Sequence, residues 1–135
     1  MKQSLDEINQ MMSHSLISNL GIHVTEITDS EIQATMPVDE RTCQPFGVLH
    51  GGASLSLAET LAGLGSMLLI AEDEYAVGAE VTGNHVSSAP VGMILHANAK
   101  IIHKGRSTHL WNVDIFTPDD KLVSTVRVLN SIRKR

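Results

Sequence analysis

Hydrophobic residues recur at helical spacing close to the start of the chain. Leu5, Ile8 and Met12 lie three or four residues apart. They begin within Ser4-Leu5-Asp6-Glu7, which has the S-x-x-E form of a capping box. This pattern predicts a short amphipathic helix that runs from Leu5 to about Ser15.

The period changes at Gly21, where apolar and polar residues begin to alternate as they do in half-buried strands. Thr28-Asp29-Ser30 divides the alternating segment into two runs and has the composition of a turn. We predict a hairpin of two strands, followed by a loop from Pro37 to Pro45. The apolar positions of the two strands are Ile22, Val24, Ile32, Ala34 and Met36.

A long apolar run extends from Gly51 to about Glu72, and Glu59 is its only charged residue before Glu72. A surface helix carries a polar face, whereas nearly every position here is apolar or small. We therefore predict a long helix that is buried and wrapped by a sheet. The segment from Val48 to Ile70 is long enough to cross a membrane, but a carboxylate at mid-bilayer is costly, so we exclude a transmembrane helix.

Four more strands are predicted after the long helix, with a turn at Thr117-Pro118-Asp119-Asp120. The order of helix, two strands, long helix and four strands predicts an α+β fold, an antiparallel sheet with one helix covering a face. The length of 135 residues fits a single domain over residues 1–135. The four strand segments are Tyr75 to Val86, Met93 to His103, Thr108 to Phe116 and Lys121 to Ile132.

Composition excludes several functions. The net charge is −5 and no basic stripe is present, which argues against a nucleic-acid partner. The basic run Arg133-Lys134-Arg135 is interpreted as a solvated tail.

The N-terminal ten residues contain acids and no apolar segment, so we expect no signal peptide and a cytoplasmic protein. The single cysteine, Cys43, excludes an intrachain disulfide and is interpreted as a bystander. No metal-ligand spacing, P-loop or dinucleotide fingerprint is present, so no metal or cofactor is predicted.

Glu59 is the first candidate for chemistry. One turn before and after it stand Leu55, Ser56, Ala62 and Gly63, so the helix offers no basic partner. The carboxylate is either solvated at an opening or buried without a counter-charge, and both situations suit a general base or nucleophile. The alternative is a structural carboxylate at an exposed edge of the helix.

His50-Gly51-Gly52 is the second candidate, because it lies where the loop becomes a helix. The first N–H groups of a helix lack intrahelical acceptors and lie at the positive end of its dipole. Without a Cβ at Gly51, an oxygen that gains negative charge can approach the N–H as in an oxyanion hole. The alternative is a tight loop in which His50 only packs.

The spacing of these groups constrains the assembly. Eight residues separate Gly51 from Glu59, which is about 12 Å along a helix axis. One reacting carbon needs its nucleophile and its oxyanion donor each about 3 Å away. A single helix cannot supply both, whereas two helices related by a two-fold axis can. If both groups are catalytic, the site lies between two copies of the chain.

Other polar residues are weaker candidates. Gln44 could donate to a substrate carbonyl, or it is an ordinary loop residue. Asn84-His85 and His103-Lys104-Gly105-Arg106 lie near predicted strand ends, where histidines are mostly structural or surface residues. Arg106 could pair with a phosphate.

At this point the run QPFGVLHGGASLSLAET resembles the motif of hotdog-fold thioesterases, in the subgroup of phenylacetate-pathway and 4-hydroxybenzoyl-CoA thioesterases. The resemblance is strongest to the members that act in enterobactin and menaquinone synthesis. It extends over nearly the whole chain, through ATMPVDERTCQPFG, VGAEVTGNHVSSA, HKGRS and LWNVDIFTPDDKLV. It implies an antiparallel sheet wrapped around the long helix, dimers that join their sheets, and commonly a tetramer of two dimers.

The resemblance also implies roles for individual residues. The family's catalytic carboxylate falls on Glu59 and its oxyanion amide on Gly51, supplied by different subunits. The residues that orient the thioester fall on Gln44 and His50. His85 matches a residue that lines the substrate site.

Contacts to coenzyme A are implied for His103, Gly105 and Arg106, which fall in the region that meets the pantetheine and phosphates.

Two positions depart from close relatives. Gly63 stands where they have Ser or Thr, with Ser66 nearly a turn further on, and Ser87 replaces an arginine of the menaquinone-type relatives. Gly63 and Ser87 are retained as expected substrate-binding positions.

We therefore expect a thioesterase that hydrolyses acyl-CoA or acyl-carrier-protein thioesters, with aryl acyl groups such as hydroxybenzoyl or hydroxynaphthoyl. Its expected protein partner is a second copy of the chain. Two alternatives stay open. One is a hotdog dehydratase of 3-hydroxyacyl thioesters, with His50 and Glu59 as base and acid. The other is a non-catalytic protein that binds acyl thioesters.

Overall fold

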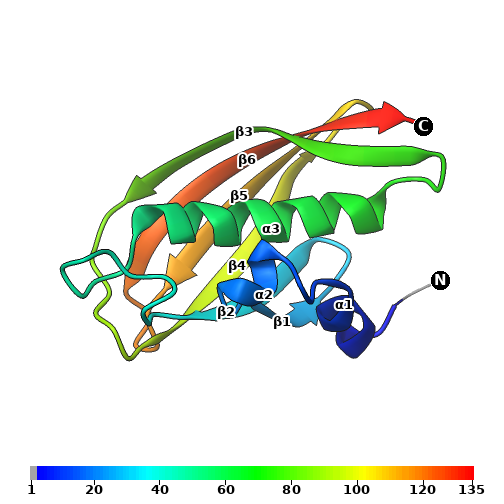
Figure 1. Ribbon diagram of the computed structural model, residues 1–135. Helices are drawn as coiled ribbons and strands as arrows, with labels where there is room; N and C mark the ends of the chain where they lie inside the picture. Colours follow the sequence, from blue (N-terminus) through cyan, green and yellow to red (C-terminus); the bar gives the residue numbers. More distant parts are fainter. Residues whose placement is uncertain (1–2) are drawn as a thin grey trace.

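In the computed structural model, which describes residues 3–135, one six-stranded antiparallel sheet wraps around one long helix (Figure 1). The strand order is β1-β2-β4-β5-β6-β3. The predicted α+β class and the antiparallel sheet around a long helix are confirmed. The elements are α1 (Leu5–Met11), α2 (Leu16–Asn19), β1 (His23–Ile27), β2 (Glu31–Pro37), α3 (Gly51–Leu69), β3 (Glu74–His85), β4 (Ile94–Lys104), β5 (Thr108–Phe116) and β6 (Leu122–Lys134).

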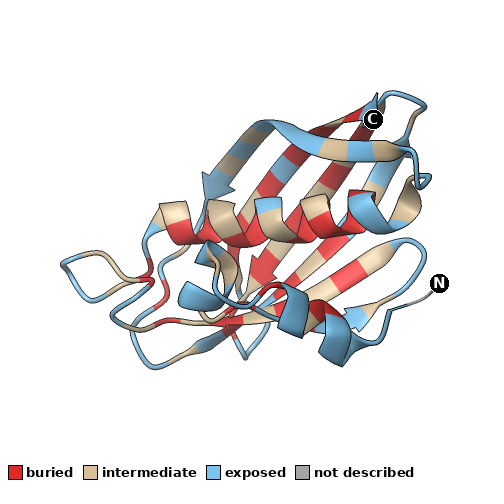
Figure 2. Cartoon of the chain, turned by 45° about the vertical axis from the view of Figure 1, so that its right-hand side comes forward, coloured by how far each residue is buried: buried red, intermediate tan, exposed pale blue. Residues whose placement is uncertain are grey.

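Helix α3 is buried on one side only. The side that faces the sheet is buried, while Glu59 and Met67 on the opposite side are exposed (Figure 2). The expectation of burial all round is therefore wrong for this face. By length and hydropathy α3 could span a membrane, but half of the relevant window is buried against the sheet, as in a core helix. The buried residues are Ala53, Ser54, Leu57, Ala58, Leu61, Ala62, Leu64, Gly65 and Ser66.

Two helix ends differ from the predictions. The first helix ends at Met11 and not near Ser15, because His14 has a left-handed φ of 55° that stops the helix, and Ser15 then caps α2. The capping box of Ser4 and Glu7 is confirmed. Helix α3 ends at Leu69, before Glu72, because the backbone of the next residue, Ile70, is extended.

The strands match the predictions to within about two residues. The expected hairpin is β1 paired with β2, and Ile32, Ala34 and Met36 are buried. Strand β3 is an edge strand: it pairs with β6 alone within the chain, and a bulge lies between Gly78 and Glu80. One side of this long strand therefore has no strand partner within residues 3–135.

A buried polar network ties α3 to the sheet. The Ser66 hydroxyl accepts hydrogen bonds from Trp111 Nε1 and Asn130 Nδ2, each at 2.9 Å, and lies 3.0 Å from His109 Nδ1. Since both lone pairs of the hydroxyl are used, its proton is left for His109 Nδ1. The neighbouring Gly65 has no side chain because the Trp111 ring occupies that space. The network fixes how α3 lies on β5 and β6.

Burial, assisted by the charge of Lys104, lowers the pKa of His109 below its ordinary value of 6.5. An unfolded chain binds the proton more readily, so this histidine contributes stability above about pH 6.5 that is lost as the pH falls below it. We expect the free energy of unfolding, measured in urea, to fall less between pH 7.5 and 5.5 in His109→Gln than in the wild type. His23→Gln, at an exposed histidine on β1, should keep the wild-type dependence. Equal pH slopes in His109→Gln and the wild type would contradict this.

Candidate functional site

His50 caps the N-terminus of α3. Its Nδ1 accepts a hydrogen bond of 2.8 Å from the Gly52 N–H, in place of the usual Ser, Thr or Asp oxygen. Its own N–H donates to the Thr42 carbonyl at 2.8 Å, which anchors the loop before the helix. Because Nδ1 is an acceptor, the neutral ring carries its proton on Nε2, which is free to donate to a ligand.

The Gly51 N–H has no hydrogen-bond acceptor within residues 3–135. The imidazole of His85, from the end of β3, lies directly against this residue: a Cβ on Gly51 would stand 2.5 Å from His85 Nε2. Glycine is needed here because the ring takes the place of a side chain. The positive end of the helix therefore carries an unpaired amide on Gly51 and an imidazole that packs against the same residue.

A cavity of about 340 Å³ opens at this end of the sheet and brings together four predicted residues: Gln44, Gly51, His85 and Ser87. Ser87 lines the cavity, but its hydroxyl donates to the Leu122 carbonyl and is not free. The remaining lining residues, which the sequence analysis did not select, are Val48, Leu49, Ser54, Val86, Ser88, Val123 and Ser124. For Ser124, one feature of the sequence could have indicated a role in this cavity: it is a serine on the otherwise apolar face of the last strand.

His50 does not line this cavity. It lies in a smaller hollow on the other side of the helix start, which it shares with Cys43 and Ser56. Cys43 is a free thiol. The two candidates for orienting the thioester, Gln44 and His50, therefore line two different hollows next to the start of α3.

Glu59 is exposed, so the buried carboxylate is excluded. A solvated carboxylate and the alternative of a structural carboxylate at an exposed edge of the helix both fit this exposure. The Oε1 atom of Glu59 lies over Gly78 of β3, where a Cβ would stand 2.5 Å away. Gly51 by contrast lies against His85, seven residues further along the same strand. Within one chain the carboxylate and the Gly51 amide therefore do not meet.

Gly63 lies one turn after Glu59, on the same side of α3. A Cβ there would meet no heavy atom within 4 Å, and the φ angle is not left-handed. A mid-helix glycine costs about 1 kcal/mol relative to alanine, and no contact within residues 3–135 requires it. Ser66 cannot supply the hydroxyl that the resemblance implies near position 63, because Ser66 is fully buried and bonded to Trp111.

The residues expected to meet coenzyme A lie elsewhere. His103 lies near the end of β4, and Gly105 and Arg106 lie in the turn that leads to β5, which is at the Glu74 end of the sheet. The cavity is at the opposite end of the sheet, beside His85. Within one chain the fold does not bring these two sets together.

The model of the thioesterase superfamily matches residues 46–124, a stretch that includes the start of α3, Glu59 and all of β3. The chain belongs to the thioesterase superfamily. It is 37% identical over 131 residues to the 1,4-dihydroxy-2-naphthoyl-CoA hydrolase of Escherichia coli, which covers 97% of this chain and 96% of the hydrolase. It is 34% identical over 129 residues to the proofreading thioesterase EntH of Cronobacter turicensis, and the match covers 96% of this chain and 93% of EntH.

Solved structures agree. The crystal structure of a thioesterase from Haemophilus influenzae has a TM-score of 0.94 at 40% identity, over 99% of this chain and 93% of that one. The crystal structure of a variant thioesterase from Pseudomonas aeruginosa has a TM-score of 0.95 at 36% identity, and the match covers 100% of this chain and 97% of that one. The predicted hotdog thioesterase family and the prediction of an enzyme are confirmed.

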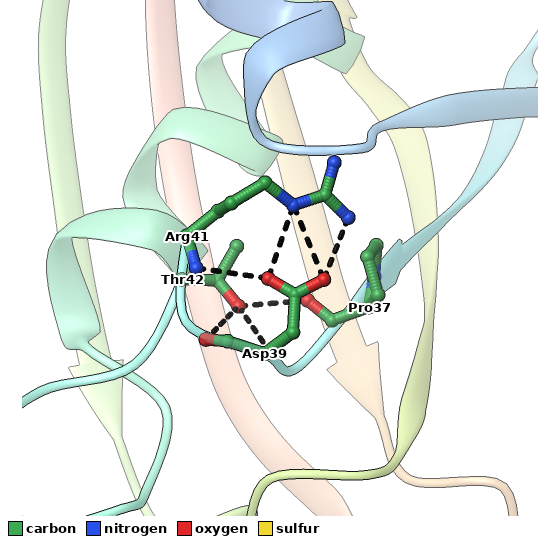
Figure 3. A network of polar contacts seen from close by, with 4 residues as sticks. All are labelled: Pro37, Asp39, Arg41 and Thr42. Carbon is green, nitrogen blue, oxygen red and sulfur yellow. Dashed lines mark hydrogen bonds and ion pairs between the residues drawn. The ribbon is translucent and has the colours of Figure 1, made fainter.

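A polar network supports the loop that carries Gln44 to the cavity of this thioesterase (Figure 3). Arg41 pairs with Asp39 at 2.6 Å, and the hydrogen-bonded guanidinium holds the pKa of Asp39 below its ordinary value. The Thr42 hydroxyl donates to the Pro37 carbonyl at 2.8 Å and accepts from the Asp39 N–H at 3.0 Å. The sequence predicts a loop here, but these contacts arise from how that loop folds back on itself.

Gly78→Ala should misplace the Glu59 carboxylate in this thioesterase without disrupting the fold, because only the mobile end of Glu59 meets the new methyl group. Misplacing a reacting group by about 1 Å can cost up to about 10²-fold. With Glu59 in the expected role of catalytic carboxylate, kcat for a benzoyl thioester should therefore fall by about 10- to 100-fold. Size-exclusion mass and thermal stability should stay near wild type.

Gly83→Ala is the matched control on the same strand, because its methyl group meets Leu55 at 2.7 Å and not Glu59. It should retain kcat. Equal losses in both variants, or full activity in Gly78→Ala, would show that Gly78 does not set the position of the carboxylate.

Proposed function

We propose that this thioesterase hydrolyses acyl-CoA or acyl-carrier-protein thioesters with aryl acyl groups. Glu59 is the nucleophile or general base and the Gly51 N–H the oxyanion donor. The observation that carries the proposal is the unpaired Gly51 N–H, which lines a cavity with His85 and Gln44 at the start of α3. Glu59 is exposed, has no ion pair within residues 3–135, and supplies the only carboxylate of α3.

The reaction then follows from the groups present. The Glu59 carboxylate attacks the thioester carbon, or removes a proton from a water molecule that attacks it. The carbonyl oxygen gains negative charge and accepts the Gly51 N–H. The C–S bond breaks and the thiolate leaves, which needs little protonation. If Glu59 attacked directly, water cleaves the resulting anhydride and restores the carboxylate.

Gln44 and the Nε2 proton of His50 are proposed to orient the thioester, and the open space beside Gly63 to receive part of the acyl group. The E. coli relative is named for a hydroxynaphthoyl-CoA substrate, which supports an aryl-CoA here. A cytoplasmic location remains our expectation.

The proposal requires a homodimer, because Gly51 and Glu59 do not meet within a chain. The unpaired side of β3 is suited to this, since an edge strand is a template for another strand. Antiparallel pairing of two β3 strands about a two-fold axis would bring the Gly51 end of one α3 toward Glu59 of the other. The end that carries His103, Gly105 and Arg106 would then face the cavity end of the partner. A dimer of dimers is our expectation for the full assembly.

Glu59→Gln tests the carboxylate directly, because the amide keeps the shape but cannot attack or accept a proton. We expect single-turnover hydrolysis of benzoyl-CoA to slow by at least ~10²-fold. A rate within about threefold of wild type would falsify the role of Glu59.

The product identifies the reaction class. Free thiol supports hydrolysis, whereas an enoyl product from a 3-hydroxyacyl thioester would indicate the dehydratase. Affinity for a panel of thioesters without thiol release would indicate a binding protein.

Mixed dimers test whether the site is shared. Gly51→Ala should be inactive because its methyl group collides with His85 Nε2, and Glu59→Gln should be inactive for lack of the carboxylate. Co-expressed with different tags, the two variants should recover about a quarter of wild-type activity, since half of the dimers then contain one intact site. No recovery, with hybrid dimers shown by tandem purification, would place both groups of a site in one chain.

A further inference from the structure

His85 is held by a single side-chain hydrogen bond. It is the last residue of β3, at the end of an edge strand, where an imidazole would otherwise turn freely. Its Nδ1 lies 2.7 Å from the hydroxyl of Ser124, its direct cross-strand neighbour on β6. Ser124 is fully buried, and β6 is paired on both sides, with β3 and β5. The tether thus comes from a rigid part of the sheet.

The other ring nitrogen faces the reaction site. His85 Nε2 is the atom that lies against Gly51, whose N–H has no acceptor within residues 3–135. With Nδ1 held by Ser124, the plane of the ring and the direction of Nε2 are both set. The imidazole therefore spans from a buried strand hydroxyl to the end of α3.

We propose that Ser124 is a positioning residue for the thioesterase reaction: its hydroxyl donates to His85 Nδ1, so that the Nε2–H points at the thioester oxygen beside the Gly51 N–H. A hydroxyl that donates to one ring nitrogen fixes the proton on the other. His85 then adds a second donor to the oxyanion site. This inference rests on the proposed function, which places the thioester oxygen at Gly51.

The tautomer is tested first, by nitrogen NMR of the imidazole groups in the intact protein without substrate, with His85→Gln assigning the signal. We expect His85 to be protonated on Nε2 in the wild type and to lose this preference in Ser124→Ala. A wild-type ring protonated on Nδ1 would overturn the proposal. Because no substrate is present, this result is independent of whether the protein hydrolyses thioesters.

Kinetics tests the consequence. Ser124→Ala should lower kcat for benzoyl-CoA by about tenfold with little change in KM, since the donor is misdirected and not removed from a binding contact. In the His85→Gln background, the same substitution should have no further effect, because a positioning residue acts only through its partner. Additive losses would mean that Ser124 serves the fold alone and would overturn the proposal.

Thr125→Val is the matched control. Thr125 is the next residue on β6, and its hydroxyl donates to Asp114 at 2.6 Å, so the variant loses one cross-strand hydrogen bond without touching His85. It should retain the His85 signal and kcat, and a loss equal to that of Ser124→Ala would contradict the proposal. Glu59→Gln should lose hydrolysis while the His85 tautomer stays unchanged, which separates failure of this inference from failure of the proposed function.

Discussion

Helix α3 packs one face of small and aliphatic residues against the sheet, and hydrogen bonds hold it near both ends. At its start, His50 caps the Gly52 N–H and is itself anchored to Thr42. Near its end, Ser66 is bonded to Trp111 and Asn130. A helix rises about 1.5 Å per residue, so a helix held in this way sets the positions of every functional group along it. The candidate site of the thioesterase depends on this packing.

Glycines determine how closely the functional side chains approach the edge strand. Gly78 leaves room for the Glu59 carboxylate, Gly83 for Leu55, and Gly51 for the His85 ring. Glycine within a strand lowers its intrinsic stability, and β3 is also an edge strand with a bulge at Gly78. A second copy of the chain that paired with β3 would compensate for both weaknesses. The same features that weaken the isolated strand therefore suit it to a shared site.

Local patterns predicted most of the architecture, because hydrophobic periodicity and capping residues act over a few neighbouring positions. Ser4 and Glu7 cap α1 as expected, and the alternation of Ile32, Ala34 and Met36 placed β2 on the core. The predictions were wrong where one residue overrode the pattern, as at His14, whose left-handed backbone ends the first helix. They were also wrong for the outer face of α3, since an apolar composition does not show how much of a helix a single sheet can cover.

The sequence by itself determined the fold class and the candidate groups. It also set the condition that Gly51 and Glu59 can serve one reacting carbon only if they come from two helices, because the rise of a helix makes their separation a matter of counting. Only the tertiary structure decided which groups share a cavity. Gln44 and His85 line one cavity with Gly51, whereas His103 and Arg106 lie at the other end of the sheet. The pairing of His85 with Ser124 spans 39 residues and depends on strand register. Register is set by packing of the whole sheet, since a slip of one residue turns every side chain to the opposite face.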